Sequence, residues 1–366
     1  MAQNAGLNAQ DRWQRPLENG RLECTLCPRS CQLADDQRGF CFVRKREGDR
    51  IVLTTYGRAS GFCIDPIEKK PLLHFFPGTS VLSFGTAGCN LGCKFCQNWD
   101  ISKAKDLSRS SVPGSPEDIA QTAAAWGCTS VAFTYNDPVI FAEYAIDTAR
   151  ACREIGIRTV AVTAGYISAE AREDFFSVMD AANIDLKAFT AGFYHKLCAA
   201  DLAPVLDTIQ YVRHHTQTWL ELTTLLIPGE NDSHEEVDRL SDWVLRELGP
   251  DVPLHFSAFH PDYRLLDARG TPPETCRRAR DQALANGLHY VYTGNISDPC
   301  GQTTYCPACK TAVISRDGYQ LRASKLTAAR CAACQCEIAG RFTDAGPSNF
   351  GSRRLAVQVP SAPAHR

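Results

Sequence analysis

The chain has 366 residues, and its 39 basic and 41 acidic side chains give a formal net charge of −2. This balance excludes a broad basic surface, so neither nucleic acid nor an anionic membrane is indicated as a partner. Residues 1–16 lack the apolar run of a secretory signal, and no stretch reaches the ~18 consecutive apolar residues of a membrane span, so we expect a soluble, cytoplasmic protein. The 18 cysteines are the most informative feature, because in a long chain without a leader they are more often metal ligands than disulfides.

Residues 1–78 are expected to form a small cysteine-rich N-terminal segment. Four of its cysteines fall within 18 residues: Cys24, Cys27, Cys31 and Cys41. This density favours a site with four thiolate ligands, in which Cys63 can substitute for one of them. The spacing is less typical of zinc than two C-x2-C turns, so zinc and a second iron–sulfur cluster both remain open here.

Residues 79–298 alternate short apolar runs with longer amphipathic segments. The expected strands are Val81–Gly85, Ser130–Tyr135, Arg158–Thr163, Asn183–Leu186, Trp219–Ile227, Pro253–Phe259 and Tyr290–Thr293. Ser115, Ser233 and Thr271 stand at helix-start signals between them. Strand–helix alternation predicts an α/β fold with a parallel sheet. The units are too few for a closed eight-fold barrel, so we expect a partial (β/α)6 TIM-type barrel, with a doubly wound sheet as the alternative.

A cysteine triplet follows the first expected strand directly. Cys89, Cys93 and Cys96 have the spacing C-x3-C-x2-C, which places three thiolates in one tight loop. Soft sulfur ligands favour an iron–sulfur cluster or zinc. Three thiolates on a 4Fe–4S cluster leave one iron open to another ligand. Because ligands of parallel sheets bind at the carboxyl ends of the strands, the position favours a catalytic cluster over a zinc site or free thiols.

At this point the sequence resembles the radical S-adenosylmethionine (radical SAM) superfamily and, within it, the pyruvate formate-lyase-activating-enzyme-like branch. It most resembles the radical SAM enzymes of the AmmeMemoRadiSam system. The motifs that carry the resemblance are Leu26–Arg29, Asp65–Pro71, His74–Phe75, Pro77–Gly78, Cys89–Trp99, Tyr135–Pro138, Asp185–Lys187, Leu226–Gly229 and the terminal cysteine pairs. In such enzymes the open iron binds SAM, and one electron cleaves SAM to methionine and a 5′-deoxyadenosyl radical.

The resemblance also implies which strand ends contact SAM. Asn136 and Asp137 would face its methionine amino group, although the close family usually has Glu where Asp137 stands, and both residues are also good helix caps. Gly165 would allow a close backbone approach to the cofactor. Asp185 and Lys187, two residues apart on a strand, would lie near the ribose and carboxylate of SAM, or form a structural ion pair with each other. His255 is expected in the core, and His260 is a substrate-site candidate.

The C-terminal part divides into residues 299–343, expected to form a zinc-ribbon-like domain, and residues 344–366, expected to be a disordered tail. Two C-x2-C pairs lie in the former: Cys306, Cys309, Cys331 and Cys334. Such pairs place four thiolates in a tetrahedron, which is typical of structural zinc, with iron as the alternative. Cys336 can replace Cys334. We expect this domain to cover the barrel or contact a partner.

Four functions remain in competition. The first is a radical SAM enzyme of the AmmeMemoRadiSam type, acting on an unidentified substrate, with an electron donor such as flavodoxin or ferredoxin and with a protein substrate or Memo-system proteins as partners. The second is an activase that abstracts hydrogen from a glycine of a partner enzyme. The third is an enzyme that transfers an aminocarboxypropyl group from SAM. The fourth is a non-catalytic iron–sulfur or zinc module, which would not need polar residues at the strand ends.

Overall fold

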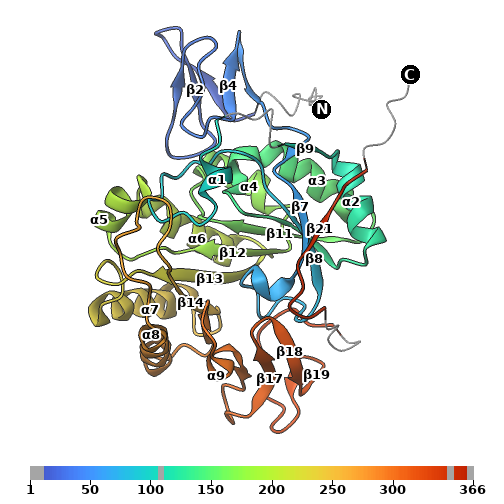
Figure 1. The fold of residues 1–366 in the computed structure, drawn as a ribbon, viewed down its shortest axis with the longest axis vertical. Helices are drawn as coiled ribbons and strands as arrows, with labels where there is room; N and C mark the ends of the chain where they lie inside the picture. Colours follow the sequence, from blue (N-terminus) through green and yellow to red (C-terminus); the bar gives the residue numbers. More distant parts are fainter. Residues whose placement is uncertain (1–11, 106–110, 344–349, 361–366) are drawn as a thin grey trace, which may run out of the picture.

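The computed structural model describes residues 12–105, 111–343 and 350–360. Its centre is a nine-stranded sheet with the strand order β15-β14-β13-β12-β11-β10-β8-β7-β21. These strands are β7 (Phe62–Pro66), β8 (Ser80–Phe84), β10 (Ser130–Phe133), β11 (Arg158–Thr163), β12 (Ala181–Asp185), β13 (Trp219–Leu226), β14 (Leu254–Ala258), β15 (Val291–Gly294) and β21 (Leu355–Val357). Figure 1 shows this sheet between the N-terminal strands at one end of the molecule and the C-terminal domain at the other.

Strand β8 and the strands from β10 to β15 run parallel, as their registers show. Six helices connect them: α2 (Pro116–Ala125), α3 (Ala142–Glu154), α4 (Ala169–Phe176), α6 (Ala203–His215), α7 (His234–Leu248) and α8 (Pro273–Ala285). In the part of the chain that is described, no ladder joins β15 to the opposite edge. The expected partial barrel with six β/α units is therefore confirmed, and β15 adds a seventh parallel strand.

Short helical turns lie at the carboxyl ends of these strands and at the end of the barrel. They are η2 (Ile67–Lys69), α1 (Trp99–Ser102), η3 (Pro138–Phe141), α5 (Ala191–Phe193), the π-helix η4 (Tyr194–Cys198) and α9 (Pro299–Gln302). Two of the expected caps are present: the hydroxyls of Ser115 and Ser233 each accept a hydrogen bond at 3.1 Å from the backbone N–H three residues on. The expectation for Thr271 is wrong, because its hydroxyl bonds the backbone of Phe259 and Leu226 instead, and α8 begins at Pro273.

Apolar side chains fill the amino-terminal end of the barrel. The buried residues of this cluster are Ile67, Leu72, Phe75, Phe76, Val81, Ala132, Val160 and Ala181. Four of them come from β8, β10, β11 and β12 near their first residues, and the rest from the segment that precedes β8. Aromatic rings of Phe75 and Phe76 thus help to close this end of the barrel.

The N-terminal segment consists of β1 (Gln14–Pro16), β2 (Leu22–Cys24), β3 (Gln32–Leu33), β4 (Arg44–Glu47), β5 (Arg50–Leu53) and β6 (Arg58–Ala59), which pairs with β9 (Val112–Pro113). Its buried residues, including Trp13 and Leu26, belong to the same hydrophobic core as the helices of the barrel. Strand β7 also lies before the expected boundary at residue 79, yet it pairs with β8. The N-terminal segment is thus packed onto the barrel, and the sheet begins earlier than expected.

The C-terminal domain has a small core of its own. Its strands are β16 (Thr304–Tyr305), β17 (Ala312–Asp317), β18 (Gln320–Ser324), β19 (Leu326–Thr327) and β20 (Arg330–Cys331). Val313, Ile314 and Leu321 pack there against Tyr290 and Tyr292 of the barrel. The buried Arg316 donates hydrogen bonds to the carbonyl groups of Leu73 and Gln302. These contacts hold the domain against the barrel.

The expectation of a disordered tail is wrong for residues 350–360. Leu355–Val357 form β21, which pairs antiparallel with Phe62–Ile64 of β7 and extends the sheet by one strand (Figure 1). This strand is short and follows a stretch rich in Pro, Ser and Gly. Its order comes from an unpaired edge of the sheet rather than from its own composition. Residues 344–349 and 361–366 lie outside the described residues.

Candidate active site

The carboxyl ends of the parallel strands meet around one cavity of about 520 Å³. Each of the seven strands, or the loop that follows it, contributes to the lining. The lining residues from these strand ends include Cys89, Cys93, Cys96, Asn136, Asp137, Thr163, Ala164, Asp185, Lys187, Thr223, Leu225, His255, Ser257, Thr293 and Asn295. The structure therefore brings together the cysteine triplet and four of the five residues expected at the cofactor.

The cysteine loop between β8 and α1 is held by the backbone of its neighbours. The N–H groups of Gly92 and Lys94 donate to the carbonyl groups of Cys198 and Leu197, at 2.7 and 2.8 Å. A Cβ on Gly92 would lie 2.9 Å from the Cβ of Ala199. The loop therefore needs glycine here, because a side chain would push it away from the π-helix.

Two sulfur atoms of the triplet have hydrogen-bond partners, but the three sulfur atoms do not converge on one point. The hydroxyl of Ser102 lies 3.1 Å from Cys96 Sγ, and the N–H of Leu91 lies 3.5 Å from Cys89 Sγ. Among the described residues, only a C-terminal group has three or more ligand atoms within 4.8 Å of one another. A single ion needs such convergence, whereas the thiolates of a 4Fe–4S cluster each bind a different iron. The triplet therefore fits a cluster better than a single ion.

Cys198, a buried cysteine at the end of the π-helix, lies against this loop. The neighbouring thiol of Cys198 and the positive charge of Lys187 lower the pKa of Cys93 to about 7 despite burial. No sequence pattern predicts this contact, because it depends on the π-helix Tyr194–Cys198 and on the left-handed residue Ala199 that ends it.

Asn136 holds the cysteine loop. Its side-chain amide donates to the carbonyl of Gly88 at 2.7 Å, and its side-chain oxygen accepts from the N–H of Thr86 at 3.1 Å. Both groups of the amide are thus engaged with the loop. Asn136 lines the cavity, but its visible role is to position the loop that carries the cysteines.

Asp137 lies buried at the wall of the cavity. Its carboxylate caps η3 by accepting from the N–H of Val139 at 3.0 Å, and it also accepts from the hydroxyl of Thr163 and the N–H of Ala164. Burial raises the pKa of Asp137 to about 6, although these hydrogen bonds oppose the rise. The helix-cap interpretation is confirmed, and the carboxylate is fixed in place at the cavity.

Asp185 and Lys187 form an ion pair on the cavity wall, with 2.8 Å between Lys187 Nζ and Asp185 Oδ2. The charge of Asp185, together with the nearby thiols, raises the pKa of Lys187 far above its usual value in spite of burial. Both side chains point to the same side of the chain, as expected. Gly165 is not in the lining; its φ is +66°, and a Cβ there would meet Ile184 at 2.9 Å.

Two further polar groups were not expected at the cavity. Tyr135 has a φ of +74°, and its hydroxyl donates to Asp65, which also pairs with Lys70 at 2.8 Å. His255 is bonded to the buried Glu221 at 2.7 Å, as a core histidine should be, yet it lines the cavity. His260 is exposed and lies outside the lining.

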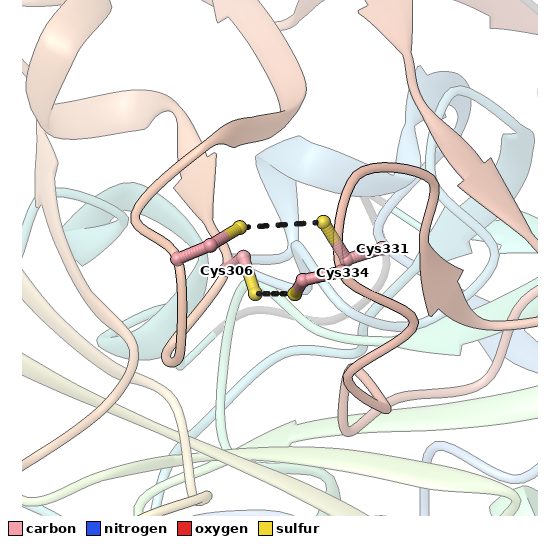
Figure 2. A group of neighbouring side chains, drawn as sticks. Cys306, Cys331 and Cys334 are labelled. Atoms are coloured by element: carbon pink, nitrogen blue, oxygen red, sulfur yellow. Dashed lines mark hydrogen bonds between the residues drawn. The ribbon is translucent and has the colours of Figure 1, made fainter.

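The four C-terminal cysteines can hold a metal ion. Their Sγ atoms all lie within 4.8 Å of one another. Figure 2 shows Cys306 and Cys334 facing each other, with 3.5 Å between the sulfur atoms, beside Cys331. A Zn–S bond of about 2.3 Å implies about 3.8 Å between the ligands of a tetrahedral site. Cys336 is not one of the four converging cysteines, and its thiol donates to the carbonyl of Glu337.

The same domain closes the cavity. Gly318 and Tyr319, in the turn between β17 and β18, and Gln302 of α9 are part of the lining. The expected covering of the barrel is therefore observed at one wall of the site. No helix in the described part of the chain has the length and apolar character needed to cross a membrane.

Comparison with known proteins agrees with this geometry. Residues 84–241 match the sequence pattern of the radical SAM superfamily. The chain is 40% identical over 300 residues to the uncharacterized protein MJ0808 of Methanocaldococcus jannaschii, covering 82% of this chain and 89% of that protein. It is 22% identical over 190 residues to pyruvate formate-lyase 1-activating enzyme of Escherichia coli, covering 50% of this chain and 75% of that enzyme.

Among solved structures, the chain is similar to a radical SAM methyltransferase from Sphaerobacter thermophilus, with a TM-score of 0.48 and 17% identity over 62% of this chain and 71% of that one. A domain of pyruvate-formate lyase-activating enzyme from Bacteroides vulgatus matches with a TM-score of 0.40 and 19% identity, over 45% of this chain and 99% of that one. With its sequence pattern and its parallel strands around one cysteine-lined cavity, the chain belongs to the radical SAM superfamily, whose members use a 4Fe–4S cluster and SAM.

Proposed function

We propose that the chain is a radical SAM enzyme that holds a 4Fe–4S cluster on Cys89, Cys93 and Cys96. When bound, such a cluster supplies the one electron that cleaves SAM to methionine and a 5′-deoxyadenosyl radical, which takes a hydrogen atom from the substrate. The observation that carries the proposal is that all three cysteines line one cavity together with polar residues from the other strand ends.

The chain's own residues would bind and orient the cofactor. Asn136 keeps the cysteine loop against β10, and the fixed carboxylate of Asp137 is available to an ammonium group such as that of methionine. Asp185 can accept hydrogen bonds from ribose hydroxyls, and Lys187 can pair with a carboxylate. Two carboxylates and an ammonium on one wall thus complement a zwitterion with a sugar, which is the chemical character of SAM.

The remaining parts of the proposal concern metal and partners. We assign zinc to Cys306, Cys309, Cys331 and Cys334, because their sulfur atoms converge as a tetrahedral ion requires. The electron would come from a donor of the flavodoxin or ferredoxin class. The enzyme would be of the AmmeMemoRadiSam type and would act in the cytoplasm on an unidentified substrate. Its candidate partners are a protein substrate or Memo-system proteins.

The test is anaerobic reconstitution with iron and sulfide, followed by incubation with SAM and dithionite. We expect methionine and 5′-deoxyadenosine. The triple variant Cys89→Ala, Cys93→Ala, Cys96→Ala should release neither, while Cys276→Ala, a buried cysteine of α8, should behave as the wild type. Formation of 5′-methylthioadenosine would instead indicate aminocarboxypropyl transfer, and absence of any SAM cleavage would favour a non-catalytic module. Hydrogen transfer to a glycine of an added partner enzyme would identify an activase.

A further inference from the structure

The four N-terminal cysteines surround a small pocket between the N-terminal segment and the barrel. Cys24, Cys27, Cys31 and Cys41 all line it. The other walls come from both sides: Leu26, Arg29, Gly39 and Arg44 from the N-terminal segment, and Asn90, Val139 and Ile140 from the barrel. All four thiols are free. Four thiols around one largely apolar pocket are a ligand set for a metal centre rather than scattered core cysteines.

The arrangement of these thiols favours an iron–sulfur cluster over a single zinc ion. At the C-terminus, the four sulfur atoms lie within 4.8 Å of one another, as one tetrahedral ion requires. Cys24, Cys27, Cys31 and Cys41 line a common pocket, yet they do not converge in this way among the described residues. A cubane cluster holds its thiolates farther apart, because each binds a different iron. Within the described residues, the convergence that one ion requires is therefore found at the C-terminal cysteines and not at these four.

Positive charge lies next to this pocket. The guanidinium of Arg44 is buried and is bonded to the carboxylate of Glu143 and the carbonyl of Ile140. Arg44 lines the pocket together with the four cysteines. A cluster with four thiolates is an anion, and a fixed neighbouring cation stabilises it in an apolar site.

The pocket touches the loop that carries the catalytic cysteines. Arg29, in its wall, donates hydrogen bonds to the carbonyl groups of Asn90 and Ala199. A Cβ on Gly88 would lie 2.1 Å from the carbonyl oxygen of Cys41. Asn90 lines the N-terminal pocket, whereas its neighbours Cys89 and Leu91 line the large cavity. The two sites are thus separated by a single stretch of backbone.

We propose that Cys24, Cys27, Cys31 and Cys41 hold a second 4Fe–4S cluster, with no open iron, that passes electrons to the cluster on the catalytic loop. In each transfer the second cluster loses one electron and the catalytic cluster gains it. A one-electron donor of the flavodoxin or ferredoxin class then reduces the second cluster again. The cluster itself is independent of the proposed function, whereas its electron-transfer role rests on it.

Iron content and spectra of reconstituted full-length variants test the cluster. The catalytic triple variant Cys89→Ala, Cys93→Ala, Cys96→Ala leaves the N-terminal pocket intact and should keep about four irons and four sulfides per chain. Its reduced electron paramagnetic resonance (EPR) signal should not respond to SAM. The variant Cys27→Ala, Cys31→Ala should keep about four irons whose signal does respond to SAM. The control is Cys152→Ala, which replaces a buried cysteine of α3. Like the wild type, it should hold about eight irons per chain.

Two outcomes would overturn the cluster, and they differ from failure of the proposed function. If the catalytic triple variant retains no iron, or if zinc occupies the N-terminal cysteines after reconstitution, the second cluster does not exist, while SAM cleavage by the wild type would still stand. If instead the Cys27/Cys31 variant loses all iron and the triple variant is unchanged from wild type, the assignment of the catalytic triplet fails and the N-terminal cluster stands.

The electron-transfer role has its own test. With reduced flavodoxin as donor, the Cys27→Ala, Cys31→Ala variant should lose most of its SAM cleavage. With dithionite, a small reductant that diffuses into the cavity, it should retain cleavage. If the variant cleaves SAM at the wild-type rate with both reductants, the electron-transfer role is overturned. The SAM-responsive EPR signal is the control that the variant is folded around its catalytic loop.

Discussion

The side-chain amide of Asn136 donates a hydrogen bond to the carbonyl of Gly88, 2.7 Å away, and so joins the end of β10 to the cysteine loop after β8. Asn136 is buried, and its side-chain oxygen accepts from Thr86 in the same loop. Through these two bonds, one residue fixes the backbone immediately before Cys89.

Asn136→Ala should therefore loosen the cysteine loop. The substitution leaves a buried carbonyl and a buried N–H without partners, which costs ~1–3 kcal/mol of stability. We expect the reconstituted variant to lose catalytic-cluster iron faster on exposure to a chelator than the wild type. The control is Asn286→Ala, which removes a bonded amide far from the cavity. Equal rates of iron loss in the wild type and both variants would contradict the positioning role.

The C-terminal cysteines should bind zinc that is needed for the domain's order. Replacing Cys309 and Cys334 by Ser should remove one tightly bound zinc per chain and expose the domain to proteases, because its small core depends on the closed site. Cys336→Ser is the matched control, since this thiol bonds Glu337 outside the group of four. Metal analysis and limited proteolysis of the full chain report both effects. Zinc content that is the same in all three proteins would refute the assignment.

The sequence predicted the parts of the site that depend on local spacing. The strands were found because buried parallel strands are nearly continuous apolar runs, as in Ser80–Phe84, where every residue is buried. The cysteine triplet and the C-terminal pairs were found because their ligands are neighbours in sequence. Asp185 and Lys187 were placed on one side by strand alternation alone, and they indeed form a pair.

What the sequence could not predict depends on contacts between distant segments. The contact of Cys198 with the cysteine loop requires a π-helix, which has no clear sequence signal. Asn136 was expected to contact SAM, but its side-chain amide points to the cysteine loop. This orientation depends on the position of the Gly88 carbonyl, to which the amide donates. The strand Leu355–Val357 forms only because β7 offers an edge, so its composition pointed to disorder.

His74 should make stability depend on pH. Its ring contacts the carbonyl of Ala339 and the hydroxyl of Tyr292, so the neutral ring donates from Nδ1 and accepts at Nε2. Burial lowers the pKa of His74 from 6.5 to about 4, although the charge of Glu221 opposes this. Above pH ~6.5 both the folded and the unfolded chain hold a neutral ring, and the stability is fully present. As the pH falls toward 4, the unfolded chain binds a proton that the folded chain does not, so stability is lost.

The measurement is the free energy of unfolding of the wild type and His74→Asn at pH 7.5 and pH 5. The difference in free energy of unfolding between the wild type and His74→Asn should be about 2 kcal/mol smaller at pH 5 than at pH 7.5. The reason is that the unfolded wild type takes up a proton on His74 in this range, whereas the variant has no imidazole there. His234→Asn, at an exposed position at the start of α7, is the control for replacing a surface imidazole. A constant difference for His74→Asn would show that its ring does not titrate as stated.

Asp185 offers the sharpest test of how the cavity binds SAM. Its carboxylate pairs with Lys187, but with its side chain 33% exposed it lies at the cavity wall rather than in the core. Asn keeps a side-chain oxygen that can accept from Lys187, and the pair lies at the solvent-lined wall of the cavity, so Asp185→Asn should change the melting temperature little. If the carboxylate accepts hydrogen bonds from the ribose, its loss should cost roughly 1.5–3 kcal/mol, or a tenfold to hundredfold loss of SAM affinity.

Asp207→Asn is the matched control, because Asp207 forms a comparable ion pair with Arg172 at 2.6 Å, away from the cavity. Calorimetric titration with SAM and thermal unfolding should be measured on the same reconstituted samples. Both variants should unfold near the wild-type temperature, and only Asp185→Asn should bind SAM weakly. If Asp185→Asn instead lowers the melting temperature and leaves SAM affinity unchanged, the ion pair with Lys187 is structural, and the ribose contact must be assigned to another residue of the cavity.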